Sequence, residues 1–230
     1  MALPVPSSPV DLARLIDHTL LKPEATAGDV LRHCSEAREH QFCSVCVNPV
    51  HVAIVAEALR GSGVGTCSVV GFPLGAVTMA DKAAETVNAV ANGADEIDMV
   101  INIGALREGR LDLVLEDIRS VRAAARSRVL KVIIEACLLD DNQKRTACRL
   151  AAEGRADFVK TSTGFSVGGA TIADVALMRA AVGDALGVKA SGGIRTREQA
   201  QAMIEAGATR IGASSGVALI AGMSVPASGY

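Results

Sequence analysis

Aromatic side chains are scarce in this sequence, which has no Trp, one Tyr and four Phe among its 230 residues. The hydrophobic fraction is nevertheless 50%, so the core has to be built from Val, Ile, Leu and Ala. Aliphatic runs are typical of parallel strands covered on both faces. An all-β sandwich would carry more aromatic residues and Thr. The composition therefore favours an α/β protein.

Several protein classes lack their usual signals here. No apolar run approaches the roughly 20 residues needed to cross a bilayer, and Met1 to Pro9 lacks the charge and apolar stretch of a signal peptide. The net charge is -2 and the basic residues are scattered, whereas nucleic-acid binding needs a concentrated positive face. We therefore expect a cytoplasmic protein without a membrane or nucleic-acid partner.

The six cysteines are expected to be thiols in a reducing compartment. Cys43 and Cys46 form a C-x-x-C pair, a spacing that occurs in zinc and redox sites. They fall in an apolar run that we interpret as a strand, where residues three apart point to opposite faces. The sequence has no second such pair, so packing cysteines are favoured over metal ligands.

Short apolar runs alternate with longer helical segments along the whole chain. The predicted strands are Ile16–Leu21, Cys43–Val47, Cys67–Phe72, Glu96–Ile101, Leu130–Glu135, Phe158–Ser162, Val188–Ser191 and Arg210–Ala213. Eight strands with intervening helices predict a single parallel (β/α)8 TIM barrel over residues 1–230, with a short tail at 224–230. The alternative is an open doubly wound sheet. Its nucleotide-binding form places G-x-G-x-x-G after the first strand, where this chain has Leu20–Pro23 without a glycine.

The helical segments have recognisable ends. Thr26, with Asp29 three residues later, predicts an N-cap that opens a helix through His40. In Met79–Asn92 the apolar residues predict a buried face, and Gly93 follows as the residue that ends the helix. That predicted face consists of Ala83, Val87 and Val90. The remaining predicted helices are Leu111–Arg126, Asn142–Glu153, Thr171–Val182 and Thr196–Ala206.

Charged residues interrupt three of the apolar strands, namely Asp98, Lys160 and Lys189. Burying an isolated charge is unfavourable, so each of these needs a partner or a shifted pKa. A structural ion pair, such as Asp98 with Lys189, would satisfy this need. However, both lysines lie near the carboxyl ends of their strands, and enzymes with this fold place their chemistry at that rim.

Two lysines in one small pocket have a specific chemical use. An amine is nucleophilic only when neutral, and a neighbouring ammonium together with desolvation favours the neutral form. Such an amine attacks a carbonyl and becomes an iminium, which eases carbon–carbon cleavage, while a carboxylate such as Asp98 moves protons. Lys131 lies at the start of its strand, deeper in the barrel, so we interpret it as a supporting residue. Glu135 lies at the rim end of the same strand and is expected to help position Lys131.

Small, hydroxyl-rich and glycine-rich segments follow strands six, seven and eight. Backbone amides in such loops can hold a phosphate, and barrels often bind phosphate near strands seven and eight. Ordinary strand-to-helix turns have a similar composition, so that interpretation stays open. The three segments are Thr161–Gly164, Ser191–Gly193 and Ser214–Gly216.

Four motifs together resemble the deoxyribose-phosphate aldolase family, in order along nearly the whole chain. They are Ile16–Leu20 (IDHTL), Glu96–Asn102 (EIDMVIN), Val159–Phe165 (VKTSTGF) and Val188–Ile194 (VKASGGI). The resemblance implies reversible cleavage of 2-deoxyribose 5-phosphate to acetaldehyde and glyceraldehyde 3-phosphate, without a metal or organic cofactor. It also implies a homo-oligomer, with a dimer as the first expectation.

The resemblance assigns roles by matching positions. Lys160 matches the Schiff-base lysine, Lys189 the second lysine that tunes it, and Asp98 the proton-transfer residue. Asp17 and Cys46 match positions that line the family's pocket, and further substrate-binding positions are Lys131, Thr161, Gly164, Gly192, Gly193, Ser214 and Ser215.

The resemblance also raises expectations for Tyr230 and Phe165. Family members often finish with a tyrosine that assists proton transfer, and Tyr230 is the last residue and the only tyrosine here. A terminus without a role is the alternative, because chain ends are often disordered. Some members carry a phosphate-binding lysine where this chain has Phe165, so the anion would depend on backbone amides and on Arg195.

Two other functions remain open from the residues alone. One is another phosphate-binding barrel enzyme, either an isomerase or a different imine-forming aldolase, and an isomerase has no need of two rim lysines. The other is a catalytically silent barrel that binds sugar phosphates or a partner. A silent barrel should lack one of the three charged positions, whereas all three are present.

Overall fold

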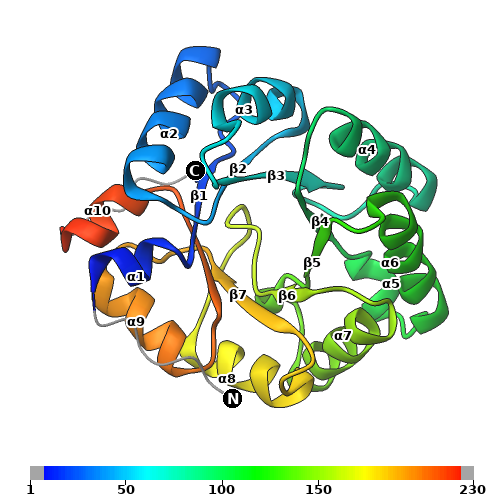
Figure 1. Ribbon diagram of the computed structural model, residues 1–230. Helices are drawn as coiled ribbons and strands as arrows, with labels where there is room; N and C mark the ends of the chain where they lie inside the picture. Colours follow the sequence, from blue (N-terminus) through cyan, green and yellow to red (C-terminus); the bar gives the residue numbers. More distant parts are fainter. Residues whose placement is uncertain (1–7, 224–230) are drawn as a thin grey trace.

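The computed structural model describes residues 8–223, and its eight strands close into a parallel barrel (Figure 1). The strands are β1 (Ile16–Leu20), β2 (Ser44–Val47), β3 (Gly65–Val70), β4 (Glu96–Val100), β5 (Val129–Ile133), β6 (Phe158–Lys160), β7 (Gly187–Ser191) and β8 (Arg210–Ala213). Each strand pairs with the next, and β8 pairs with β1. The predicted (β/α)8 barrel is therefore confirmed, with strand ends within two residues of those predicted, and the open sheet is excluded.

Helices surround the barrel on the outside (Figure 1). They are α1 (Pro9–Ala13), α2 (Ala27–His40), α3 (Val52–Leu59), α4 (Met79–Ala91), α5 (Ile103–Arg107), α6 (Leu111–Ala125), α7 (Asp141–Glu153), α8 (Ile172–Val182), α9 (Arg197–Glu205) and α10 (Gly216–Ala221), with 3₁₀ turns at Pro49–His51 and Ala136–Leu138. Thr26 and Asp29 form the predicted capping box of α2. Gly93 follows the end of α4 with a φ of 102°, a conformation that favours glycine. No helix within residues 8–223 is long and apolar enough to cross a membrane.

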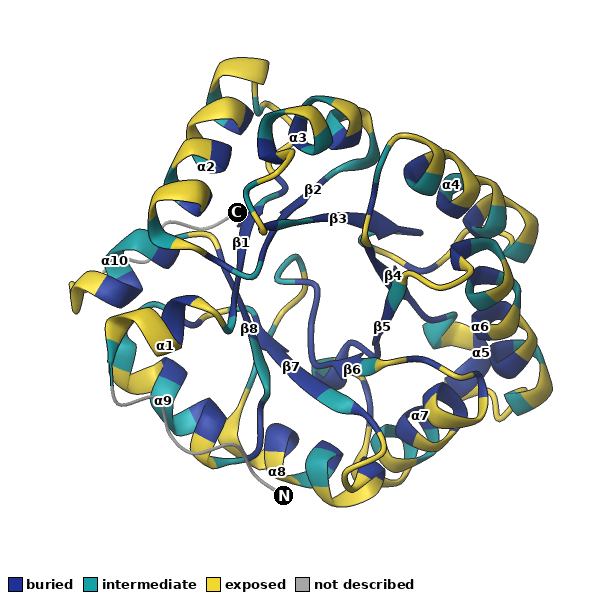
Figure 2. Cartoon of the chain, viewed as in Figure 1, coloured by how far each residue is buried: buried dark blue, intermediate teal, exposed yellow. Residues whose placement is uncertain are grey.

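Apolar side chains occupy two separate regions. The larger region fills the space between strands and helices, where Figure 2 shows the buried faces of the helices turned towards the barrel. The smaller region lies inside the barrel and contains only Leu21, Cys46, Cys67 and Val69, with Phe72 and Phe165 packed against them. The interior also holds the buried charged residues, so the hydrophobic stabilisation of this fold comes mainly from the outer layer.

The predicted apolar face of α4 is buried only in part. Val90 is half-buried against the core but Val87 is 54% exposed, and the fully buried residues are Lys82, Thr86 and Ala89. Lys82 is fully buried because its ammonium group donates to the carboxylate of Asp117 on α6 at 2.5 Å. A pattern based on apolar residues cannot detect a face that is buried through an ion pair.

Candidate active site

Lys160, Lys189 and Asp98 converge inside the barrel, as predicted. The Lys160 Nζ donates to Asp98 Oδ2 at 2.8 Å, and the Lys189 Nζ donates to the same oxygen at 2.7 Å. All three side chains are buried. One carboxylate oxygen thus holds the two amines beside each other.

A second carboxylate lies next to the first. Asp17 on β1 forms an ion pair with Lys189, with Nζ 2.5 Å from Oδ2, and its Oδ1 accepts a hydrogen bond from Ser44 Oγ at 2.7 Å. Lys131 on β5 donates to Asp98 Oδ1 at 2.8 Å, and its Nζ lies 3.7 Å from Asp17 Oδ2. Lys131 therefore belongs to the same cluster as the other two lysines.

Two further charged residues belong to this cluster and were not predicted from the sequence, Glu96 and Arg210. Glu96 accepts from Lys131, and Arg210 Nη1 reaches Asp17 Oδ1 at 2.7 Å and Glu96 at 3.2 Å. Each is the first residue of its strand, where a charged side chain is usually exposed to solvent. Their only signal in the sequence is an acid and a base that begin two apolar strands at the same end of the barrel.

Strand register explains why these side chains meet. Asp98 pairs with Lys131 across β4 and β5, and Lys160 pairs with Lys189 across β6 and β7. Gly212 on β8 leaves the space that Lys189 uses, since a Cβ at Gly212 would lie 3.0 Å from Lys189 Cε. A closed barrel directs alternate side chains of every strand inwards, which concentrates these charges in one small volume.

The electrostatics of the cluster keep most of its members ionised. Burial alone would raise the pKa of Asp98, but Lys131, Lys160 and Lys189 hold this pKa well below its usual range. Burial would lower the pKa of Lys189, but Asp17 and Asp98 raise it above its usual value. The pKa of Lys131 is raised in the same way, with Asp98 as the main carboxylate that raises it. Lys131 and Lys189 are thus fixed as ammonium groups.

The charges of the cluster do not balance if every group is ionised. Among the described residues the cluster contains four cationic side chains and three carboxylates: Lys131, Lys160, Lys189 and Arg210 with Asp17, Glu96 and Asp98. Within the described residues Lys160 forms an ion pair with Asp98 alone, whereas each of the other three cations contacts at least two carboxylates. A neutral Lys160 would remove the surplus charge with the loss of a single ion pair.

The predicted phosphate loops lie together at the carboxyl end of the barrel. Gly164, Gly192 and Gly193 all have positive φ values, of 88°, 87° and 79°. A Cβ at Gly192 would approach Gly169 Cα to 3.0 Å and Gly164 Cα to 3.5 Å. The loops after β6 and β7 therefore pack backbone to backbone, and glycine is needed there for both conformation and space.

Hydroxyl groups in these loops are divided between structural roles and open positions. Thr161 Oγ1 accepts from Ser191 N at 3.1 Å, and Ser191 Oγ donates to Ser162 O at 2.6 Å, which joins the two loops. Ser162 Oγ is buried and has no partner within the described residues. After β8, Ser214 is exposed and Ser215 is half-buried.

Glu135 at the rim end of β5 supports the loop after β6. Its carboxylate accepts from both the backbone N–H and the hydroxyl of Thr163. Burial raises the pKa of Glu135, and its backbone has a φ of 52°. Glu135 was expected to help position Lys131, but its hydrogen bonds within the described residues go to Thr163 and Cys137.

The cysteines behave mainly as packing residues. Cys43 precedes β2 and is half-buried, whereas Cys46 lies inside the barrel opposite Cys67 of β3. Cys46, Cys67 and Asp98 have potential metal ligand atoms within 4.8 Å of one another. The three ammonium groups on Asp98 would repel a cation at that position, so this group does not favour a metal site.

Phe165 closes one side of the barrel mouth. Its ring packs edge-on against Phe72, with the ring centroids 5.2 Å apart. The predicted residue Tyr230 lies outside the described residues.

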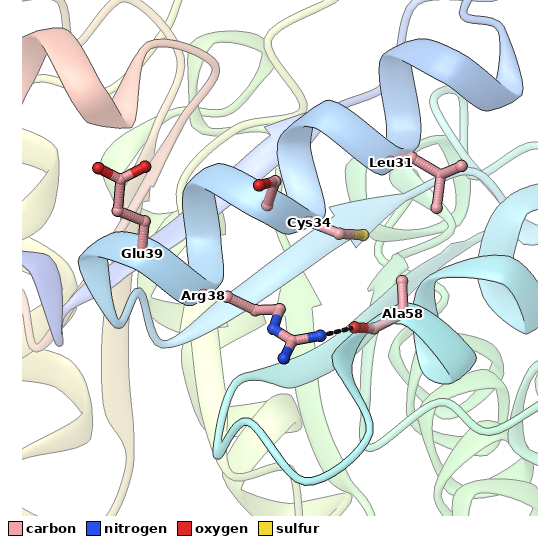
Figure 3. Close-up of a pocket in the computed structure, with 6 residues that line it drawn as sticks. Leu31, Cys34, Arg38, Glu39 and Ala58 are labelled. Atoms are coloured by element: carbon pink, nitrogen blue, oxygen red, sulfur yellow. Dashed lines mark hydrogen bonds between the residues drawn. The ribbon is translucent and has the colours of Figure 1, made fainter.

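A groove of about 550 Å³ lies between α2 and α3 and includes Leu31, Arg38 and Ala58 (Figure 3). It is on the outer layer, and no predicted site residue lines it.

Comparisons with known proteins agree with this geometry. The model of the DeoC/LacD family aldolase matches residues 12–224. A deoxyribose-phosphate aldolase of Streptococcus suis strain 98HAH33 is 63% identical over 211 residues, which cover 92% of this chain and 96% of the relative.

Two solved structures are similar over their length. A putative deoxyribose-phosphate aldolase from Coccidioides immitis has a TM-score of 0.93 at 42% identity, covering 96% of this chain and 88% of the other. The deoxyribose phosphate aldolase of Aeropyrum pernix, described as tetrameric, has a TM-score of 0.89 at 35% identity, covering 94% and 92%. The family match, the sequence identity and the cluster of lysines and carboxylates lead to one conclusion, that this chain belongs to the DeoC/LacD family of aldolases.

Proposed function

We propose that the protein catalyses the reversible aldol cleavage of 2-deoxyribose 5-phosphate to glyceraldehyde 3-phosphate and acetaldehyde. The observation that carries this proposal is the pair of buried lysines on one oxygen of Asp98, with Lys189 fixed as an ammonium group. The chain's membership of an aldolase family supports the reaction class.

Lys160 is the proposed nucleophile. The surplus positive charge of the cluster favours the loss of one proton, and Lys160 forms fewer ion pairs with carboxylates than the other cations. Its neutral amine would attack the aldehyde carbon of the open-chain sugar and form an iminium with loss of water. The iminium takes up the electrons of the bond between C2 and C3, while a base removes the proton of the C3 hydroxyl. Glyceraldehyde 3-phosphate leaves, and protonation and hydrolysis of the remaining enamine release acetaldehyde.

Asp98 is proposed to move protons during these steps. It starts as an anion, and Lys160 is one of the three ammonium groups that hold its pKa low. When Lys160 becomes neutral, that pKa rises, and Asp98 gains the capacity to take and return a proton. Lys189, Asp17 and Lys131 would keep the local charge and the position of Asp98 fixed through the cycle.

The phosphate is proposed to bind at the loops after β6, β7 and β8. Gly164, Gly192 and Gly193 bring backbone amides to the rim, and Ser214 and Ser215 follow β8. Since Lys160 and Lys189 lie on the strands that lead into two of these loops, one extended sugar phosphate can reach both regions. Phe165 cannot contact the anion as a lysine would, so the amides, with Arg195, would supply the attraction.

Tyr230 is proposed to assist proton transfer at the acetaldehyde carbon, because a phenol can donate and accept a proton. Deletion of Tyr230 is expected to slow exchange of the acetaldehyde methyl protons with solvent more than it weakens binding of inorganic phosphate. NMR in deuterated buffer measures the exchange, and an unchanged rate would remove Tyr230 from the mechanism.

The location and the oligomeric state of the enzyme are also proposals. A cytoplasmic homo-oligomer is expected, and the Aeropyrum pernix relative is described as tetrameric. Light scattering coupled to gel filtration would distinguish a dimer from a tetramer. An isomerase or a silent sugar-phosphate-binding barrel is the alternative function, and imine trapping separates both from the aldolase.

The decisive experiment is reduction by borohydride in the presence of 2-deoxyribose 5-phosphate, followed by peptide mass spectrometry. An adduct on Lys160 is expected, and Lys160→Leu should abolish it. An adduct on another lysine would keep the imine chemistry but reject Lys160. No adduct on folded protein that binds the substrate would reject the aldolase in favour of an isomerase or a silent barrel.

A further inference from the structure

The loop that follows β3 carries part of the apolar wall inside the barrel. Its residue Phe72 packs against the small apolar region of the interior, and the Phe72 ring lies edge-on to Phe165 with the ring centroids 5.2 Å apart. The buried members of that region are Leu21, Cys46, Cys67 and Val69. The position of the Phe72 ring therefore sets part of the shape of this wall.

Two residues of α4 hold the loop where it leaves β3. The Gly71 N–H donates to Glu85 Oε2 at 2.7 Å, and Gly75 N donates to Gly71 O at 2.7 Å, which closes the inner turn. Gly71 has a φ of 60°, and a Cβ there would lie 2.9 Å from Lys82 Cε, so the stem of Lys82 packs directly on the loop. Since α4 packs on the outside of the barrel beside β3 (Figure 1), an outer helix fixes the backbone directly before Phe72.

The outer part of this loop has no comparable support. Among residues 8–223, the bond between Gly71 and Glu85 is the one hydrogen bond from a side chain to the backbone of residues 71–77. Leu74 is 73% exposed, and a hollow of about 470 Å³ lies between residues 76–79 and α6. The loop is therefore held at its inner end, next to the aromatic ring that faces the barrel.

The apolar wall adjoins the carboxylate that holds the lysines. Cys67 Sγ donates to Asp98 Oδ1 at 3.3 Å, and Lys160 donates to the other oxygen of Asp98. In the proposed reaction the acceptor aldehyde carries a hydroxyl and a phosphate, whereas the donor, acetaldehyde, ends in a methyl group. Polar groups are unfavourable against an apolar surface that offers them no hydrogen bond, whereas a methyl group gains by burial there. The wall is thus the surface that suits the donor.

We propose that Glu85 is a positioning residue that sets the selectivity for the donor aldehyde, acting through Gly71 and Phe72. This role rests on the proposed aldolase reaction. Glu85 does not touch the substrate. Its carboxylate fixes the Gly71 amide and so limits how far the Phe72 ring moves away from the donor. A donor with one more methylene, such as propanal, is disfavoured while this bond is intact, and loss of the bond widens the space.

Aldol addition to glyceraldehyde 3-phosphate, with acetaldehyde or propanal as the donor, tests this role. Glu85→Leu removes the acceptor and is expected to lower the ratio of kcat/KM for acetaldehyde to that for propanal at least about threefold, within the range that one methylene can supply. The KM for acetaldehyde should rise. The KM for glyceraldehyde 3-phosphate should not change, because the proposed phosphate loops follow β6, β7 and β8.

Two variants serve as controls for this experiment. Glu85→Gln keeps a carbonyl oxygen that can accept from Gly71 N–H, so its ratio should match that of the wild type. Glu116→Leu removes an exposed glutamate of the neighbouring helix α6 and should also leave the ratio unchanged. Glu85→Ala removes the same acceptor as Glu85→Leu and replaces it in the experiment if the leucine variant does not fold.

A double variant shows whether Glu85 acts through the aromatic ring. In the Phe72→Ala background, Glu85→Leu should cause no further change in the ratio, because the group that it positions is gone. An unchanged ratio in folded Glu85→Leu, an equal loss in Glu85→Gln, or the full effect in the Phe72→Ala background would each overturn the proposal. Borohydride trapping of Lys160 is expected in both wild type and Glu85→Leu. No adduct in wild type would reject the proposed function, whereas trapping with an unchanged ratio would reject only the role of Glu85.

Discussion

At the scale of single residues, each charge buried inside the barrel is stabilised by its ionic partners, and the number of these partners differs between residues. Asp98 accepts from three lysines, and Asp17 binds Lys189 and Arg210 while lying near Lys131. Each charge is tolerated in the buried site because an opposite charge contacts it. Lys160 has the fewest carboxylate partners, so it combines burial with the freedom to react.

Lys160→Leu is expected to reduce turnover by at least about a thousandfold, because a hydrocarbon cannot form an imine. The fold should persist, since the change removes a charge that is in surplus. Lys22→Leu, at an exposed lysine, is the control and should retain activity. Steady-state rates with 2-deoxyribose 5-phosphate measure the effect, and near-normal turnover of Lys160→Leu would rule out this nucleophile.

Lys131→Met should lower the free energy of unfolding by about 3–5 kcal/mol, because Glu96 and Asp98 lose a buried counter-charge. The exposed pair of Arg128 with Asp95 provides the comparison. Arg128→Met should change stability by less than about 1 kcal/mol. Urea unfolding of the two variants measures both values. Equal losses would mean that the buried network does not stabilise the barrel.

The convergence of three charges in the candidate site could be predicted because charges in apolar strands are rare. Lys160, Lys189 and Asp98 all interrupt apolar runs, and parallel strands bring such positions together. Arg210 and Glu96 could not be found in this way, since they begin their strands.

At the scale of helices and strands, burial through ion pairs is the feature that sequence periodicity missed. Eight strands and the longer helices follow from apolar spacing and caps, and the short helices α1, α3, α5 and α10 were not predicted because they give too little periodicity. On α4 the periodicity missed the most buried side of the helix, since Lys82 is buried against Asp117. The two helices therefore meet through a charged contact within an apolar interface.

The coupling between Lys82 and Asp117 can be measured in a double-mutant cycle. Lys82→Met and Asp117→Leu should each destabilise the protein by about 3–5 kcal/mol, because each leaves one buried charge alone. The double variant should lose much less than the sum, since it leaves an apolar contact. Thermal or urea unfolding gives the four free energies. Strict additivity would show that the two side chains do not stabilise each other.

At the scale of the whole molecule, buried thiols link global stability to alkaline pH. Burial raises the pKa of Cys148 on α7 to about 12 from a usual value of 9.0. Above pH 9 the unfolded chain releases this proton while the folded protein retains it. The stabilising contribution is therefore complete below pH 9 and is lost as the pH rises towards 12.

Wild type should thus lose about 2 kcal/mol more than Cys148→Ala between pH 9 and pH 11. Urea unfolding in the presence of a reductant measures the difference. The same substitution at Cys137, which is half-buried, is the control and should leave most of the loss in place. Parallel pH profiles for wild type and Cys148→Ala would contradict the link.

The two apolar regions of the barrel have a consequence for how this protein can change. The outer layer between strands and helices carries the hydrophobic core, and the interior carries the charges that are proposed to react. Substitutions that increase heat tolerance can therefore accumulate in the outer layer while the reaction chamber stays intact. Selection for a new aldehyde would instead act on Phe72, Phe165 and Val69, the small apolar wall inside the barrel. Robustness and substrate choice can thus be engineered in separate libraries and then combined.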